Sequence, residues 1–202
     1  MDKNIVFDFD ETIGYFEQII DIIRHTKKTS KLEVFEFFNL FPLVFRTNIF
    51  DIFNYIVRLK KEKKIKSVIL YSNNNNDVFI EYVLSYIHET LNFPLFDLSI
   101  SLKQTQNKNK NLPDLLKYSN GLLTKKSSIF FIDDKEYDQM KSIKYYIKCE
   151  SYKYLYSNSC IKDKLNIDLN TSYKSKIISQ SIYTIISKEI INKLRLFVLI
   201  NI

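Results

Sequence analysis

The stretch Asn4-Ile-Val-Phe-Asp-Phe-Asp-Glu-Thr-Ile-Gly14 decides which fold the sequence predicts. Its apolar run is followed by two carboxylates and a hydroxyl at alternate positions, Asp8, Asp10 and Thr12. A short run of β-forming residues that ends in acids and a glycine is typical of a buried parallel strand that ends at a loop. Because ligands bind at the carboxyl ends of strands in open α/β sheets, we expect a binding site at this loop.

Asp8 and Asp10 need a partner if both lie at this strand end. Two neighbouring carboxylates repel each other, and burying them without a cation costs free energy. A hard divalent ion that prefers oxygen ligands, such as Mg²⁺, is the natural partner. The alternative is a strand end with two solvated acids that help to cap a following helix.

The composition favours one domain with a hydrophobic core, since 46% of the 202 residues are apolar. Cys149 and Cys160 lack the spacing of a metal site, so we expect ordinary cysteines in a reducing compartment, with no disulfide framework. His25 and His88 are too few and too isolated for a zinc site or a Ser–His triad.

The net charge of +7 would suit an anionic substrate or partner through electrostatic steering. The lysines, however, accompany an excess of Asn, Ile and Tyr that resembles codon usage in an AT-rich genome, so the charge is discounted as evidence for nucleic-acid binding. We find no signal-peptide pattern and no run of the ~18 apolar residues that would span a bilayer. We therefore expect no membrane partner and a cytoplasmic location (the host cytoplasm for a viral protein), with the nucleus as the alternative.

Apolar spacing predicts both helices and strands along the chain. Helices are expected over 15–24, over 48–64 with Asn48 as cap, over 78–91 with Asn76 or Asp77 as cap, and from Ser172 onward. Strands are expected over 66–71, 94–101, 128–133 and 142–148. Residues 32–45 could be helical or irregular, whereas 103–111 and 150–170 are expected to be irregular. The last helix should pack on the sheet or on another helix, with a dimer contact as an alternative, through the stripe Ile178, Ile182, Ile185, Ile186, Ile190 and Leu194.

A second strand end carries hydroxyl and amide groups. The expected strand over 66–71 is followed by Ser72, Asn73 and four further polar residues before the next helix begins. Free backbone N–H groups at a helix N-terminus point at an anion, so this segment is a candidate phosphate site. The alternative is a polar linker that reflects the Asn-rich composition.

A third strand end carries paired acids again. The apolar run that begins at Ser128 ends at Asp133 and Asp134, and Asp138 follows four residues later. Paired acids after a strand are uncommon without a metal ion. We interpret Asp134 as the main metal ligand and Asp133 as a second candidate.

Taken in order, these motifs resemble the haloacid dehalogenase (HAD) superfamily. The segment 8–12 matches its D-x-D-x-T motif, and Ser72 takes the place of the Ser or Thr that ends its second strand. Lys110-Asn-Leu-Pro-Asp114 is similar to its K-P-x-P-D motif, with Asn111 in place of the first Pro. Asp134 and Asp138 have the D-x-x-x-D spacing of its fourth motif.

The resemblance implies an α/β fold, a doubly wound (Rossmannoid) parallel sheet with flanking helices. The catalytic core would span residues 1–150, with a small helical insert over about 15–45, and 151–202 would form a C-terminal helical extension packed on the core. The D-x-D-E-T form and the stretch 45–72 are similar to the branch of polymerase C-terminal-domain phosphatases and NLI-interacting-factor-like proteins. Arg46-Thr-Asn48 departs from the R-P-G turn of that branch.

The resemblance also implies phosphoryl transfer. Asp8 would be the nucleophile and Asp10 the general acid and base. Mg²⁺ would be held by the Asp8 carboxylate, the backbone carbonyl of Asp10, and Asp134 or Asp133. Thr12 would order the loop. The phosphate oxygens would be held by Ser72, Asn73 and Lys110, with Lys103, Lys108 and Lys117 as alternatives to Lys110.

The function expected from this set is that of a Mg²⁺-dependent phosphatase acting on a phosphorylated substrate, with a phosphoserine or phosphothreonine protein favoured. One alternative is a nucleic-acid 3′-phosphatase or a metabolite phosphatase on the same scaffold. Another is a catalytically idle HAD-like binding module, although the presence of both Asp8 and Asp10 argues against it.

Overall fold

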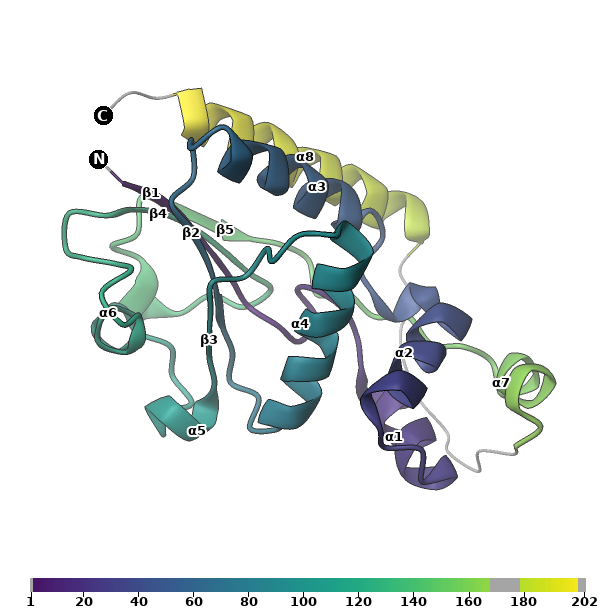
Figure 1. Ribbon diagram of the computed structural model, residues 1–202. Helices are drawn as coiled ribbons and strands as arrows, with labels where there is room; N and C mark the ends of the chain where they lie inside the picture. Colours follow the sequence, from purple (N-terminus) through teal and green to yellow (C-terminus); the bar gives the residue numbers. More distant parts are fainter. Residues whose placement is uncertain (1, 168–178, 200–202) are drawn as a thin grey trace.

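The computed structural model describes residues 2–167 and 179–199 and has an α/β architecture (Figure 1). Its five-stranded sheet has the order β3-β2-β1-β4-β5, and every neighbouring pair is parallel. The arrangement is consistent with a Rossmann-like fold and confirms the expected parallel α/β sheet. The strands are β1 (Lys3–Phe7), β2 (Ser67–Tyr71), β3 (Leu98–Ile100), β4 (Ser128–Asp133) and β5 (Tyr145–Lys148).

The register aligns the carboxyl ends of the three central strands. Phe7, the last residue of β1, pairs with Leu70 on β2 and with Ile132 on β4. Asp8 and Ser72 therefore leave the sheet at the same edge as Asp133. Connections between parallel strands return through helices, so these side chains meet although they lie far apart in sequence.

Helices cover both faces of the sheet (Figure 1). On one face, α3 and α8 lie side by side next to α4, over the side chains of Phe7, Leu70 and Phe130. The alternate residues of the same strands face α6 on the other side. The helices are α1 (Glu17–Thr26), α2 (Lys31–Leu40), α3 (Ile49–Lys61), α4 (Asp77–Leu91), α5 (Leu102–Thr105), α6 (Leu112–Tyr118), α7 (Asn158–Leu165) and α8 (Gln180–Leu199), with short 3₁₀ turns at Pro42–Val44 and Asp138–Met140.

The segment 15–45, expected as a helical insert, holds α1, α2 and the first 3₁₀ turn. Residues 32–45 are mainly helical, because Ser30 and Glu33 form a capping box at the start of α2. Aromatic rings anchor the insert to the core, as Phe16 and Phe38 pack edge-to-face on Phe79 of α4. A side chain at Gly14 would collide with a backbone carbonyl of this segment, so glycine is required there.

Two segments expected to be irregular contain helices. The polar segment 103–111 begins within α5, and 150–170 includes α7, whose cap is Ser157 accepting a bond from the Cys160 amide. The Tyr- and Lys-rich sequence around Ser157 gave no indication that a helix begins there. Asn48 does precede α3, but in a left-handed conformation and without a side-chain capping bond. Asn76 caps α4 as expected, accepting from the amide of Phe79.

The predicted apolar stripe of α8 is partly wrong. Ile182 and Ile185 are 46% and 65% exposed, and both Ser172 and Ile178 lie outside the described residues. Burial of hydrogen-bonded hydroxyls, rather than hydropathy alone, sets the inward face of the helix. Ile190 and Leu194 do face the core, together with Tyr183, Ser187 and Phe197. Within residues 2–167 and 179–199, the helices are all too short or too polar to span a bilayer.

Candidate active site

The loop after β1 is a tight turn that directs its acids toward β4. The amide of Asp8 donates to the Ile132 carbonyl at 2.9 Å, which continues the strand pairing by one residue. Glu11 adopts a left-handed conformation (φ 59°) and its amide donates to the Gly14 carbonyl at 2.7 Å. A non-glycine residue rarely adopts this conformation outside a constrained turn. The turn brings Asp8 and Asp10 to the carboxyl edge of the sheet.

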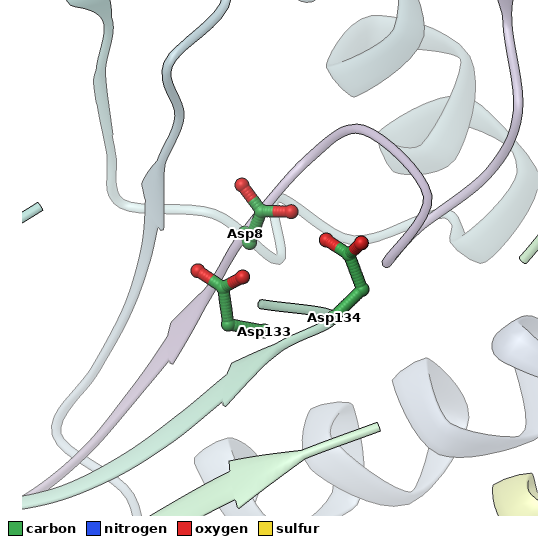
Figure 2. A group of neighbouring side chains, drawn as sticks. All are labelled: Asp8, Asp133 and Asp134. Carbon is green, nitrogen blue, oxygen red and sulfur yellow. The ribbon is translucent and has the colours of Figure 1, made fainter. Parts of the chain in front are cut away.

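Three buried carboxylates meet at this edge. Asp8, Asp133 and Asp134 each offer one oxygen within 4.8 Å of the others, and Figure 2 shows them at the ends of the neighbouring strands β1 and β4. Such a group could hold a metal ion, because carboxylate oxygens are the ligands that hard divalent cations prefer. The pairing of β1 with β4 therefore joins the first and last acidic motifs of the sequence.

Lys110 lies between two of these acids. Its ammonium donates to Asp8 Oδ1 and to Asp133 Oδ2, the latter at 2.7 Å, and the residue is 1% exposed. Burial lowers the pKa of Lys110, but the charges of Asp8 and Asp133 outweigh this and leave that pKa above its usual value. The ammonium therefore stays charged. Three aromatic rings surround it at 5.6–5.8 Å from their centroids, those of Tyr71, Phe131 and Tyr137.

The two acids after β4 have different partners. Asp133 accepts from Lys110 through one oxygen and from the Lys135 amide at 2.8 Å through the other. Asp134 accepts from the Ser151 hydroxyl at 2.6 Å, and its own amide donates to Thr12 Oγ1 at 3.0 Å. Thr12 thus ties the first loop to the last, which is the ordering role expected for it.

Burial shifts the pKa values of these two acids upward. For Asp133, burial and then the charge of Asp8 raise the pKa to about 7, while Lys110 opposes the shift. For Asp134, burial raises the pKa and the Ser151 hydroxyl opposes it. Both shifts mean that burial disfavours the ionised form of these two acids.

Asp10 lies at the outer side of the cluster and is partly exposed. Its two oxygens accept from the side-chain amide of Asn74 at 3.2 and 3.1 Å. Burial, followed by the charge of Asp8, raises the pKa of Asp10 to about 6. A carboxyl with this pKa can both donate and accept a proton near neutral pH.

The two predicted phosphate-binding residues after β2 have different positions. Ser72 is fully buried, and its hydroxyl oxygen accepts from the backbone N–H of Asn74 at 2.9 Å. Asn73 directs its side-chain amide to the Lys108 carbonyl and the Tyr137 hydroxyl, not to the acids. The asparagine that contacts the acidic cluster is Asn74. The run of four asparagines carried no signal that would have distinguished it.

Among the four candidate lysines, Lys110 is the one that contacts Asp8. Lys103 pairs with Asp77 at the start of α4, and Lys117 lies over the ring of Tyr118. Lys108 is exposed.

Asp138 does not join the cluster, despite its D-x-x-x-D spacing from Asp134. Its side chain is 90% exposed and pairs with Lys141 at 2.7 Å. The 3₁₀ turn that begins at Asp138 directs this carboxylate to solvent.

Ser151 is the main site residue that the sequence did not reveal. It follows β5 in a segment without regular structure, 17 residues after Asp134. A serine in such a segment has no pattern that marks it. Only the parallel pairing of β5 with β4 brings it to Asp134.

The donor set fits a divalent cation. Four carboxylates lie close together here, those of Asp8, Asp10, Asp133 and Asp134, and Lys110 contacts two of them, Asp8 and Asp133. An excess of buried negative charge is costly unless a cation offsets it. A cavity of about 250 Å³ opens beside Lys110, lined by Asn109, Glu136, Tyr137, Asp138 and Gln139.

Comparisons of this chain with protein-family models, with curated proteins and with solved structures find no match.

Proposed function

We propose that this protein is a Mg²⁺-dependent, HAD-type phosphatase that hydrolyses a phosphomonoester through an aspartyl-phosphate at Asp8. The observation that carries the proposal is the contact of Asp8 with Lys110, beside Asp133 and Asp134, at the end of the strand that leads into the D-x-D-x-T motif. A buried carboxylate next to a fixed ammonium suits attack on a phosphorus atom, because the ammonium offsets the charge of the phosphoryl oxygens.

In the first step, an Asp8 oxygen forms a bond to phosphorus and the bond to the leaving oxygen breaks. Asp10 gives its proton to that oxygen. In the second step, Asp10 takes a proton from a water molecule, whose oxygen attacks phosphorus and releases Asp8 as a carboxylate. The pKa of about 6 for Asp10 supports both roles, since the group is available in either form near neutral pH.

The metal would be held by the Asp8 carboxylate, the backbone carbonyl of Asp10 and Asp134. Bound there, Mg²⁺ would offset the repulsion between the Asp8 carboxylate and the anionic phosphate. Asp134 suits this role better than Asp133, because one oxygen of Asp134 has no hydrogen-bond donor among the described residues. Both oxygens of Asp133 already accept hydrogen bonds. We infer that Asp133 chiefly holds Lys110 in place.

Protein phosphoserine or phosphothreonine is the substrate that we favour, on the resemblance of the first motif and of the stretch 45–72 to the C-terminal-domain phosphatase branch. A nucleic-acid 3′-phosphate and a small phosphorylated metabolite are the alternatives. A further alternative to the phosphatase is a HAD-like module that binds without turnover.

Hydrolysis of p-nitrophenyl phosphate with Mg²⁺ and with EDTA tests the proposal. We expect turnover that requires the metal. Phosphopeptides and a 3′-phosphorylated oligonucleotide, compared at equal concentration and moderate salt, then separate the substrate classes. Metal binding without turnover on any of these substrates would favour the binding module, and turnover in EDTA would contradict the mechanism.

A further inference from the structure

Arg46 is a buried cation that contacts the active-site loop. It is 2% exposed, and its Nε donates to the Thr12 carbonyl at 2.6 Å. Its Nη2 donates to the carbonyls of Glu11 and Glu150, both at 2.7 Å. Among the described residues, no carboxylate lies within ion-pair distance of this guanidinium. One side chain therefore joins the loop after β1 to the segment after β5, through three backbone carbonyls and a 3.5 Å contact of Nη2 with Cys149 Sγ.

Two tyrosines complete the surroundings of Arg46. The guanidinium carbon lies 5.6 Å from the ring centroid of Tyr152 and 5.7 Å from that of Tyr183, and the two rings pack edge-to-face. Tyr183 belongs to α8, and its hydroxyl donates to the Ser151 carbonyl and accepts from the Lys153 amide, both at 3.0 Å. We call Arg46, Tyr152 and Tyr183 the Arg46 brace.

The segments held by the brace are those that position the acids. Thr12, whose carbonyl Arg46 binds, accepts the amide of Asp134 through its hydroxyl. Ser151, whose carbonyl Tyr183 binds, donates its hydroxyl to the carboxylate of Asp134. Glu11 lies next to Asp10, and its carbonyl also accepts from the Tyr152 amide at 2.8 Å. The brace touches neither Asp10 nor Asp134. It holds the backbone at Glu11 and Thr12, which follow Asp10, and at Ser151, whose side chain contacts Asp134.

Burying a guanidinium with dipoles as its partners costs free energy that an apolar side chain would not. The Nη1 atom has no hydrogen-bond partner among the described residues, so the compensation is incomplete. The three carbonyls converge on one planar fork, a geometry that a lysine ammonium cannot reproduce.

We infer that Arg46 and Tyr183 are positioning residues for Asp10 and Asp134, and that α8 is thereby part of the catalytic apparatus. The inference rests on the proposed phosphatase function. Ser187 of α8 adds to the attachment, because its hydroxyl donates to the Thr47 carbonyl, next to Arg46, at 2.6 Å. A displacement of ~1 Å at a catalytic group can cost ~100-fold in rate. A brace that holds the backbone next to Asp10 and Asp134 can therefore control turnover.

Kinetics of Arg46→Lys and Tyr183→Phe test the inference. Arg46→Lys keeps the charge and loses the fork, whereas Tyr183→Phe keeps the ring and loses both hydrogen bonds. We expect kcat to fall ~10–100-fold in Arg46→Lys and ~3–10-fold in Tyr183→Phe, with KM nearly unchanged, as for partners that orient catalytic groups. Tyr156→Phe is the matched control, since its half-buried hydroxyl bonds the Leu43 amide, away from the acids. It should keep the wild-type kcat.

Hydrogen exchange gives a readout that does not depend on activity. Peptides covering 9–14 and 149–153 should exchange faster in both brace variants than in wild type, and those covering α1 and α2 should not change. If wild type proves to have no phosphatase activity, hydrogen exchange still tests whether the brace orders segments 9–14 and 149–153. Wild-type kcat together with unchanged exchange in Tyr183→Phe would overturn the inference, even if Arg46→Lys failed to fold.

Discussion

The two acids at the end of β1 differ from each other in the same way as the two acids at the end of β4. Asp8 and Asp133, the inner acids, both contact the ammonium of Lys110. Asp10 and Asp134, the outer acids, are held by neutral donors, the Asn74 amide and the Ser151 hydroxyl. One cation thus serves the inner acids, and the outer acids have none in contact among the described residues.

This difference indicates where additional positive charge would bind. The inner acids form a network with Lys110 that is nearly closed to solvent. Neutral donors offset the charge of the outer acids only in part, and burial raises the pKa of Asp10 and of Asp134, as it also raises that of Asp133. We therefore expect a metal ion to be held by Asp8 and Asp134, with Asp10 as the proton-transfer group and Asp133 as the partner of Lys110.

Asp8→Asn should have the largest effect. Loss of the nucleophile should lower kcat at least ~10³-fold, while the similar shape of asparagine keeps the fold. Steady-state kinetics and a urea unfolding curve measure the two properties separately. Activity close to wild type in the purified, folded variant would remove Asp8 from the mechanism.

Lys110→Met should disrupt the inner acids. Asp8 and Asp133 would be left as buried like charges without a cation, so we expect a loss of ~3–5 kcal/mol in the free energy of unfolding and at least ~100-fold in kcat. Urea unfolding without metal measures the first. The added change Asp133→Asn should recover part of the stability. Lys117→Met, at an exposed lysine over Tyr118, is the control.

Asp134→Asn, compared with Asp133→Asn, tests whether an outer acid binds the metal more strongly than the inner acid next to it. We expect Mg²⁺ affinity to fall at least ~10-fold in Asp134→Asn and less in Asp133→Asn, because hydrogen bonds already engage both oxygens of Asp133. Calorimetric titration of each variant with Mg²⁺ gives the comparison. A larger loss of Mg²⁺ affinity in Asp133→Asn than in Asp134→Asn would assign the metal to Asp133.

The stability of the metal-free protein should fall as the pH rises from about 4 to about 7. Asp10 and Asp133 have folded-state pKa values of about 6 and about 7, above the ordinary value of 3.8 for an aspartate. Across this window the folded state binds more protons than the unfolded state, so its advantage is greatest at low pH and is lost as these acids ionise.

The variant Asp10→Asn isolates one part of this pH dependence. For Asp10 the shift corresponds to at most ~3 kcal/mol. Urea unfolding in EDTA at pH 5 and pH 8 should show a smaller fall in Asp10→Asn than in wild type. Mg²⁺ should stabilise wild type more at pH 8 than at pH 5, because it binds the ionised acids. Equal falls in both proteins would contradict the assignment to Asp10.

Ser151→Ala should have the smallest effect of the set. It removes a single hydrogen bond to Asp134, and a hydrogen bond to a charged group contributes ~1.5–3 kcal/mol to stability. We expect Mg²⁺ affinity and kcat each to fall by a few-fold. A calorimetric titration beside Asp134→Asn would check it, and an effect as large as that of Asp134→Asn would mean that Ser151 itself binds the metal or the substrate.

The sequence predicted the parts of the site that lie at strand ends. An apolar run followed by acids marks a strand and its ligand-binding end together, so Asp8, Asp10, Asp133 and Asp134 could be placed before the fold was known. Lys110 was chosen through its motif, and the structure brings it to Asp8.

Residues that act through tertiary contact could not be predicted. Asn74, Ser151 and Tyr183 lie near the site because distant segments meet, and their local sequences carry no pattern of charge or spacing. Arg46 stood out only as the Arg of an R-P-G-like turn, which gave no indication of its contacts. The inward face of α8 was misjudged for the same reason, since a hydrogen-bonded tyrosine is buried where an isoleucine stripe was expected.

Trapping of the phosphoryl group on Asp8 is the strongest test of whether this carboxylate is the nucleophile. The variant Asp10→Asn should still release p-nitrophenol, a leaving group that needs no general acid, but should hydrolyse the aspartyl-phosphate slowly. With Mg²⁺, we expect a burst of about one p-nitrophenol per chain. After an acid quench, the peptide that contains Asp8 should be heavier by the mass of one phosphoryl group. A burst with the phosphoryl group on another residue, or steady turnover with Asp8 unmodified, would contradict this role of Asp8.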